Sequence, residues 1–144
     1  MAETSLEILL VEDNLNDAEL SLYALKKFKI ANSIYHARDG EEALSYLFGI
    51  PLAESIPQVP RLILLDLKLP KVDGLEVLRK LKSDPRTQSV PVVVLTSSRE
   101  ERDIVESYHL GVNSYIVKPI DFEQFTEAVR SVGLYWLLLN QSPA

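Results

Sequence analysis

The sequence contains no cysteine in its 144 residues, which excludes disulfides, thiol catalysis and cysteine metal sites. It has no uninterrupted apolar run near the length needed to cross a membrane. The N-terminal stretch "MAETSLEILLVEDN" lacks the basic region and the small-residue cleavage site of a secretory signal. These absences favour a protein of the reducing cytoplasm, and we expect no membrane association.

Positive charge is also scarce in this chain. Lys and Arg together number 15 against 21 Asp and Glu, which gives a net charge of −6 at pH 7. Binding to the backbone of a nucleic acid requires a basic surface, so we expect no nucleic-acid partner. The two histidines, His36 and His109, show no metal-ligand or catalytic-triad spacing, and we expect structural roles for both.

The composition is otherwise that of a globular protein, with 47% hydrophobic and 25% charged residues. A chain of this length buries a sizeable core without disulfides or metal ions. We therefore expect a single domain over residues 1–144, with a core at about 6–139 and a frayed tail at 140–144. The chain ends about where its last predicted helix does, so we expect no output domain.

Two periodicities alternate along the chain. Short apolar segments predict five strands, at residues 6–12, 33–37, 61–66, 90–98 and 113–119. Apolar residues spaced three or four apart predict five helices, at residues 17–28, 40–49, 74–83, 100–111 and 121–140. In the first helix region the residues Leu15, Ala18, Leu22 and Leu25 recur at three- and four-residue steps and form one face of the predicted helix.

The strict alternation of strands and helices determines the fold class that we expect. Strands that are almost wholly apolar are covered on both faces, as parallel strands flanked by helices are. Alternation implies βαβ crossovers, and hence a doubly wound α/β sheet of five parallel strands. The working crevice of such a sheet lies beyond the carboxyl ends of its strands.

Chemically active side chains follow four of the five predicted strands. Glu12 and Asp13 end the first strand, Asp66 the third, Thr96 the fourth and Lys118 the fifth. Because parallel strands end at the same edge of a sheet, we expect these groups to meet in one pocket. Three crowded carboxylates are unfavourable in their charged forms unless a cation joins them.

The residue types at this edge indicate phosphoryl chemistry. Carboxylate oxygens without histidine or cysteine suit a hard cation such as Mg²⁺. Thr96 is positioned to donate a hydrogen bond to a phosphoryl oxygen, and Lys118 to neutralise another. Asp66 is then the candidate nucleophile, which would form an aspartyl phosphate.

Four segments carry a resemblance to a known family. "ILLVEDN", "LILLDLKLPKVDG", "VVVLTSS" and "YIVKPI" resemble, in their order, the signature segments of response-regulator receiver domains. The spacing fits as well, since 30 residues separate Asp66 from Thr96 and 22 separate Thr96 from Lys118. The resemblance runs from about residue 6 to 135, and implies a flavodoxin-like sheet of order 2-1-3-4-5 with five helices on its two faces.

The resemblance also implies a role for each site residue. Asp66 would be the phosphoacceptor, and the Mg²⁺ ligands would come from Glu12, Asp13, Asp66 and the backbone carbonyl of Lys68. Contacts to the phosphoryl group would come from Thr96 and Lys118, and the conformational switch from Thr96 and Tyr115. The Lys118–Pro119 peptide bond would be cis, a form that is accessible only before proline.

A closer resemblance concerns the partner. The loop at 50–60, with three prolines, and the ending "SVGLYWLLLNQSP" look like the small stand-alone receivers that serve bacterial, especially cyanobacterial, phytochrome histidine kinases. We therefore expect a sensor histidine kinase of this kind as partner, with a downstream protein that the sequence does not identify. Lys68, two residues after Asp66, departs from common receiver patterns and is a candidate to alter the lifetime of the phosphoryl group.

The predicted last helix contains six consecutive apolar residues at 134–139, which one buried face cannot cover. They either pack against the chain's own core or form an interface. We favour the interface, in a two-fold homodimer through the face made by helix four, strand five and helix five.

Other functions remain as alternatives. A phosphatase that uses an aspartyl phosphate would place a second acid two residues beyond the nucleophile, where this chain has Lys68. A flavin protein on a similar sheet would need a hydroxyl- and glycine-rich loop in place of "VEDNLND". We expect a signalling switch that catalyses only its own phosphorylation and dephosphorylation, and not an enzyme with a separate substrate. A receiver-like module that binds a protein without switching is the alternative.

Overall fold

The computed structural model describes residues 7–27, 33–48, 59–67, 74–97 and 112–131. Several predictions lie outside these residues: the helix at 100–111 with His109, the backbone carbonyl of Lys68, and the apolar run at 134–139. No helix within the described ranges is long and apolar enough to span a membrane.

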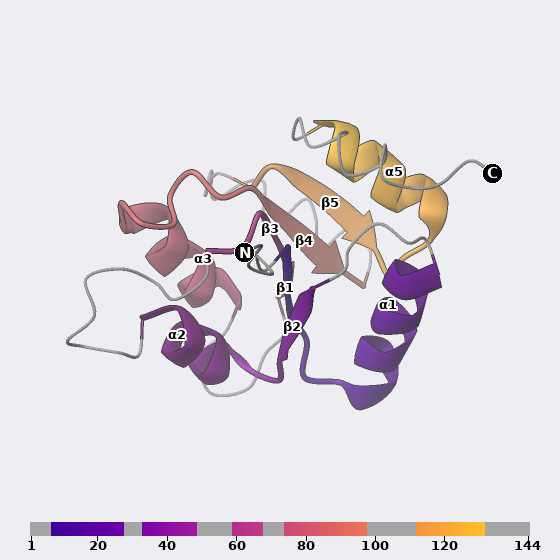
Figure 1. Ribbon diagram of the computed structural model, residues 1–144, viewed down its shortest axis with the longest axis horizontal. Coiled ribbons are helices and arrows are strands. Elements are labelled where there is room, and N and C mark those ends of the chain that lie inside the picture. The colour runs from indigo at the N-terminus through magenta and orange to yellow at the C-terminus, as the bar shows by residue number, and fades with distance from the viewer. Residues whose placement is uncertain (1–6, 28–32, 49–58, 68–73, 98–111, 132–144) are drawn as a thin grey trace, which may run out of the picture.

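Five parallel strands form one sheet in the order β2-β1-β3-β4-β5 (Figure 1). Their bounds are β1 (Ile8–Val11), β2 (Ile34–Ala37), β3 (Leu62–Asp66), β4 (Val92–Thr96) and β5 (Ser114–Val117). Each neighbouring pair is parallel, and β1 and β3, which are not consecutive in the chain, lie side by side at the centre. The predicted fold class and strand order are confirmed.

Helices cover both faces of this sheet. Those in the described residues are α1 (Leu15–Lys27), α2 (Gly40–Phe48), α3 (Gly74–Ser83) and α5 (Phe122–Ser131). Figure 1 shows α2 and α3 on one side of the sheet, and α1 and α5 on the other. This is the doubly wound arrangement that alternating strands and helices predict.

Each strand contributes to two hydrophobic cores, because successive side chains point to opposite faces. Leu9 and Val11 of β1 pack in the core beneath α2 and α3, whereas Ile8 and Leu10 pack in the core beneath α1 and α5. All residues of β1, β3 and β4 are buried. Burial on both faces explains why these strands are continuous apolar runs rather than alternating ones.

The start of α1 differs from the prediction. The helix begins at Leu15, two residues earlier than expected, because the side-chain Oδ1 of Asn14 accepts a hydrogen bond of 2.9 Å from the Asp17 N–H and caps it. Leu15, which the apolar spacing places on the same helix face as Ala18 and Leu25, is 64% exposed. It lies in the first turn, at the rim of the sheet, whereas Ala18 and Leu25 further along are buried.

Candidate functional site

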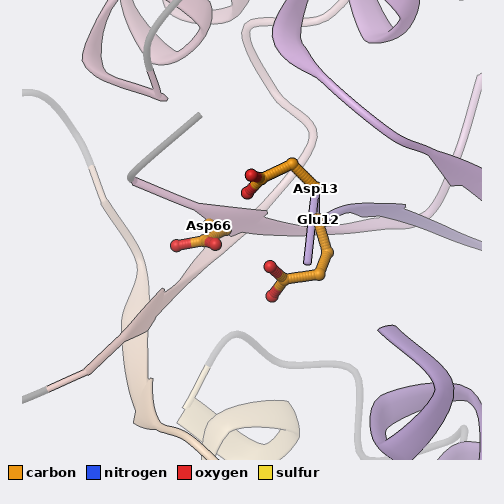
Figure 2. A group of neighbouring side chains, drawn as sticks. All are labelled: Glu12, Asp13 and Asp66. Atoms are coloured by element: carbon orange, nitrogen blue, oxygen red, sulfur yellow. The ribbon is translucent and has the colours of Figure 1, made fainter. Parts of the chain in front are cut away.

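Three carboxyl groups meet at the carboxyl end of the central strands. β1 and β3 pair in register, so that Glu12, just after Val11, lies beside Asp66 at the end of β3. Carboxylate oxygens of Glu12, Asp13 and Asp66 all lie within 4.8 Å of one another (Figure 2). Glu12 and Asp66 are buried and Asp13 is exposed, so the group opens to solvent on one side.

The electrostatics of this group favour an added cation. The pKa of Glu12 is raised to about 8, first by burial and then by the hydrogen bond to Asp66 and the negative charge of Asp66. The positive charge of Lys118 and the hydrogen bond from the Asn14 N–H lower this pKa and offset part of the rise. A proton on Glu12 is therefore one way to relieve the repulsion between two buried carboxylates, and a divalent cation is another. The donor set consists of oxygen alone, which fits Mg²⁺ or Mn²⁺.

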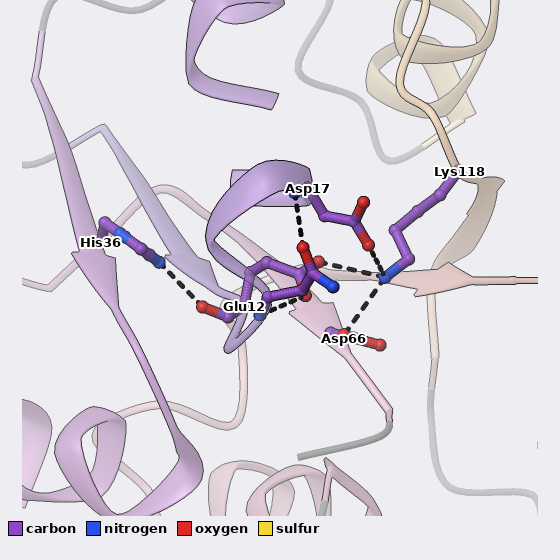
Figure 3. Close-up of polar contacts among 6 residues, drawn as sticks. Glu12, Asp17, His36, Asp66 and Lys118 are labelled. Atoms are coloured by element: carbon purple, nitrogen blue, oxygen red, sulfur yellow. Dashed lines mark hydrogen bonds and ion pairs between the residues drawn. The ribbon is translucent and has the colours of Figure 1, made fainter. Parts of the chain in front are cut away.

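Lys118 brings a cation from the far edge of the sheet. Its ammonium Nζ donates hydrogen bonds to Glu12 Oε1 at 3.2 Å, Asp66 Oδ2 at 3.2 Å and Asp17 Oδ2 at 2.9 Å (Figure 3). Burial alone would lower the pKa of Lys118, but the hydrogen bond to Asp17 and the charges of Asp66 and Glu12 hold it above its usual value. The ammonium form of Lys118 is therefore favoured at neutral pH.

Asp17 was not among the residues predicted for the site. It stands in the first turn of α1, where acids are common because they complement the helix dipole. No pattern in the sequence indicated a partner 101 residues away, and only the folded chain brings Asp17 to Lys118.

Thr96 lies at the end of β4, the strand beside β3. The residue is fully buried, and its hydroxyl oxygen has no hydrogen-bond partner among the described residues. An unpaired buried hydroxyl costs free energy, which is consistent with a group held for a ligand.

Tyr115, the predicted switch residue, is half-buried on β5. It packs against the core beneath α2 and α3 and lines a hollow of about 690 Å³ between β5 and α5. The Lys118–Pro119 peptide bond that follows is cis, as the resemblance implied.

Two further residues support the backbone of the site. The Nε2 atom of His36 on β2 lies 2.8 Å from the backbone carbonyl oxygen of Glu12 (Figure 3). A structural role was expected for His36, and this contact places it against the backbone of a site residue. Gly74 at the start of α3 donates its N–H to the Leu67 carbonyl, and a Cβ there would lie 2.6 Å from the Asp66 carbonyl oxygen. Position 74 thus requires a residue without a side chain.

Two curated relatives match nearly the whole chain. The "Probable methanogenesis regulatory protein FilR2" of Methanothrix harundinacea is 44% identical over 99% of this chain and 90% of its own length. Response regulator Rcp1 of Synechocystis is 41% identical over 95% of this chain and 92% of its own length.

Solved structures agree with these matches. The bacteriophytochrome response regulator AtBRR superposes with a TM-score of 0.82 at 50% identity, covering 96% of this chain and 99% of that one. The Mn²⁺-bound form of Rcp1 gives 0.69 at 41% identity over 95% and 98%. The phosphorylated cyanobacterial phytochrome response regulator RcpA gives 0.71 at 41% identity over 97% and 99%.

The response regulator receiver domain family matches residues 8–130 of this chain. This range contains all the strands and helices described above, except for Ser131, the last residue of α5. With the sheet order and the acidic group at its carboxyl edge, this match establishes the family: the chain belongs to the response-regulator receiver domains.

Proposed function

We propose that this receiver is a phosphorylation-driven signalling switch whose phosphoacceptor is Asp66. The proposal rests on the surroundings of the Asp66 carboxylate. This carboxylate is buried beside Glu12 and Asp13 and accepts a hydrogen bond from the Lys118 ammonium. Thr96, whose hydroxyl has no hydrogen-bond partner within the described part of the chain, ends the neighbouring strand. A buried carboxylate with a cation, further acids and a spare donor nearby suits the capture of a phosphoryl group.

The proposed Mg²⁺ ligands are the carboxylates of Glu12, Asp13 and Asp66, with the backbone carbonyl of Lys68. The Mn²⁺-bound form of the relative Rcp1 supports a divalent cation in this family. When bound, such a cation neutralises phosphoryl oxygens and orients the incoming group.

The protein's own residues perform the remaining steps. A carboxylate oxygen of Asp66 attacks the phosphorus of a phosphohistidine, the new P–O bond forms as the P–N bond breaks, and the imidazole nitrogen keeps the electron pair and takes a proton from water. Lys118 neutralises a phosphoryl oxygen, and Thr96 donates its hydroxyl hydrogen to another. The phosphorylated form of the relative RcpA supports this chemistry.

The added charge would then change the surface. Thr96 would move toward the phosphoryl group and Tyr115 would turn inward, which would alter the face around β5 and α5. That face is the proposed site of a two-fold homodimer and of contact with a downstream protein. Light scattering at micromolar concentration, before and after phosphorylation, tests the dimer, and a monomer in both states would contradict it.

For the upstream partner we propose a phytochrome histidine kinase, because AtBRR and RcpA are phytochrome response regulators. Phosphotransfer from a purified phytochrome kinase to this receiver, compared with transfer from an unrelated histidine kinase, tests this choice. Equal transfer rates from the two kinases would contradict it.

The acceptor is tested by intact mass spectrometry after incubation with acetyl phosphate and Mg²⁺. We expect a phosphate adduct on the wild type that is absent from Asp66→Asn and absent without Mg²⁺. Glu19→Gln, which removes an exposed carboxylate from α1, is the matched control and should form the adduct normally. If neither acetyl phosphate nor a histidine kinase phosphorylates the wild type, the protein is a binding module that does not switch.

A further inference from the structure

Three carboxylates share the Lys118 ammonium, and they differ in what else they are needed for. Glu12 and Asp66 are proposed metal ligands, and Asp66 is also the proposed nucleophile. Asp17 has neither role, yet its contact of 2.9 Å with Nζ is shorter than the two contacts of 3.2 Å. Its side chain is also the most exposed of the three, at 37% against 6% for Asp66 and none for Glu12.

The Asp17 carboxylate does not accept the hydrogen bond that is common for an acid at its position in a helix. An acid three residues after a helix cap commonly bonds back to the N–H of the capping residue. Here the N–H of Asn14 is instead donated to Glu12 Oε2 at 3.2 Å. The Asp17 carboxylate is turned across to Lys118, as Figure 3 shows.

The competition for Lys118 changes when the site is filled. A cation and a phosphoryl group would draw the oxygens of Glu12 and Asp66 away from the lysine. Of its three carboxylate partners in the described residues, Asp17 alone would then remain. An unrestrained lysine side chain has several rotatable bonds, and its ordering has an entropic cost.

We propose that Asp17 is a positioning residue: it holds the Lys118 ammonium at the rim of the site when the carboxylates of Glu12 and Asp66 bind the cation and the phosphoryl group. This inference rests on the proposed function. Before the cation binds, Asp17 draws the ammonium partly away from the metal ligands. During phosphoryl transfer, it keeps the same ammonium within reach of the incoming group.

The alternative is that Asp17 acts only through its charge, as an acid at a helix N-terminus. The two accounts differ in whether the effect passes through Lys118. A double-mutant cycle with Asp17→Asn and Lys118→Met separates them, because effects that do not pass through the lysine add. Glu19→Gln again serves as control, since it removes a carboxylate from the same helix two residues away.

Two quantities are measured: the Mg²⁺ dissociation constant by calorimetry, and the rate of adduct formation from acetyl phosphate at saturating Mg²⁺. We expect Asp17→Asn to weaken Mg²⁺ binding and to slow the adduct, each by about two- to fivefold, the range for a partly exposed ion pair. Glu19→Gln should change neither, and in the Lys118→Met background Asp17→Asn should have a smaller effect.

Equal fold-changes in the two backgrounds would overturn the inference, as would wild-type behaviour of Asp17→Asn. If Lys118→Met does not fold, NMR of the Lys118 ammonium in the Mg²⁺-bound protein decides: slowed hydrogen exchange in the wild type should be lost in Asp17→Asn, and unchanged exchange refutes the contact. A wild type that binds Mg²⁺ but forms no adduct from either acetyl phosphate or a histidine kinase refutes the proposed function. The double-mutant cycle on Mg²⁺ binding still tests Asp17 in that case.

Discussion

The buried carboxylate of Glu12 should give the metal-free protein an unusual pH dependence of stability. Burial, and then the nearby Asp66, raise the pKa of Glu12 to about 8 in the folded chain, from a usual value of 4.5. Between these values the folded protein holds a proton that the unfolded chain has released. The free energy of unfolding must therefore fall as the pH rises through this window, and the stabilisation is complete only below the lower value.

The size of the effect follows from proton linkage. One proton difference gives a slope of about 1.4 kcal/mol per pH unit. With the pKa of Glu12 near 8, the wild type should lose about 2.5 kcal/mol of stability between roughly pH 5.5 and 7.5. In Glu12→Gln the group cannot titrate, so this component of the slope should vanish.

The measurement is urea unfolding in EDTA at several pH values, for the wild type and for Glu12→Gln. The comparison of slopes matters, because all other titrating groups are common to the two proteins. Adding Mg²⁺ should reverse the trend in the wild type, since the cation competes with the proton and binds better as the pH rises. Parallel curves for the two proteins in EDTA would refute the assignment of the raised pKa to Glu12.

Three further predictions concern residues around the site. Gly74→Ala should destabilise the protein by about 1–3 kcal/mol, the usual cost of overpacking, because the new Cβ would lie 2.6 Å from the Asp66 carbonyl oxygen. The same variant should form the phosphate adduct more slowly. Wild-type stability in urea unfolding would contradict this prediction. Thr96→Val should leave urea stability unchanged or higher, because the hydroxyl has no partner among the described residues, and a loss of about 2 kcal/mol would show a hidden hydrogen bond. The same variant should abolish the phosphorylation-dependent NMR shifts of β5 and α5, while the shifts next to Asp66 remain. Gln124→Leu should lower the free energy of unfolding by about 1–2 kcal/mol, measured by thermal unfolding. The side-chain amide of Gln124 accepts a hydrogen bond from the Val117 N–H and donates one to the Val117 carbonyl, both at 2.9 Å. An unchanged melting temperature would show that these two hydrogen bonds to the edge strand contribute nothing to stability.

The architecture was predictable because it depends on local patterns. Strands buried on both faces must be apolar throughout, and β1, β3 and β4 are recognisable in the sequence for that reason. The boundary of α1 was less predictable. Leu15 continues the apolar spacing of the helix, but the cap at Asn14 places it in an uncovered first turn.

The candidate site was predictable to the extent that parallel strands share an edge. That rule places Glu12, Asp13 and Asp66 together, and the structure brings their carboxylates within 4.8 Å. The roles proposed for Thr96, Lys118 and Tyr115 remain predictions. The contact of His36 with the Glu12 carbonyl was missed, because a histidine on a strand gives no sign of which neighbouring backbone it will reach.

The sequence by itself determined the order of the elements and the chemistry available at the edge of the sheet, since both follow from periodicity and from the residues that end each strand. Only the tertiary structure decided how the charges are shared. Lys118 reaches Glu12, Asp17 and Asp66, at separations in the chain of 106, 101 and 52 residues. Strand order and the packing of the crossover helices determine which residues meet across such separations in the chain. The electrostatic energies then depend on the distance between the charges and on their burial, neither of which a local sequence pattern specifies.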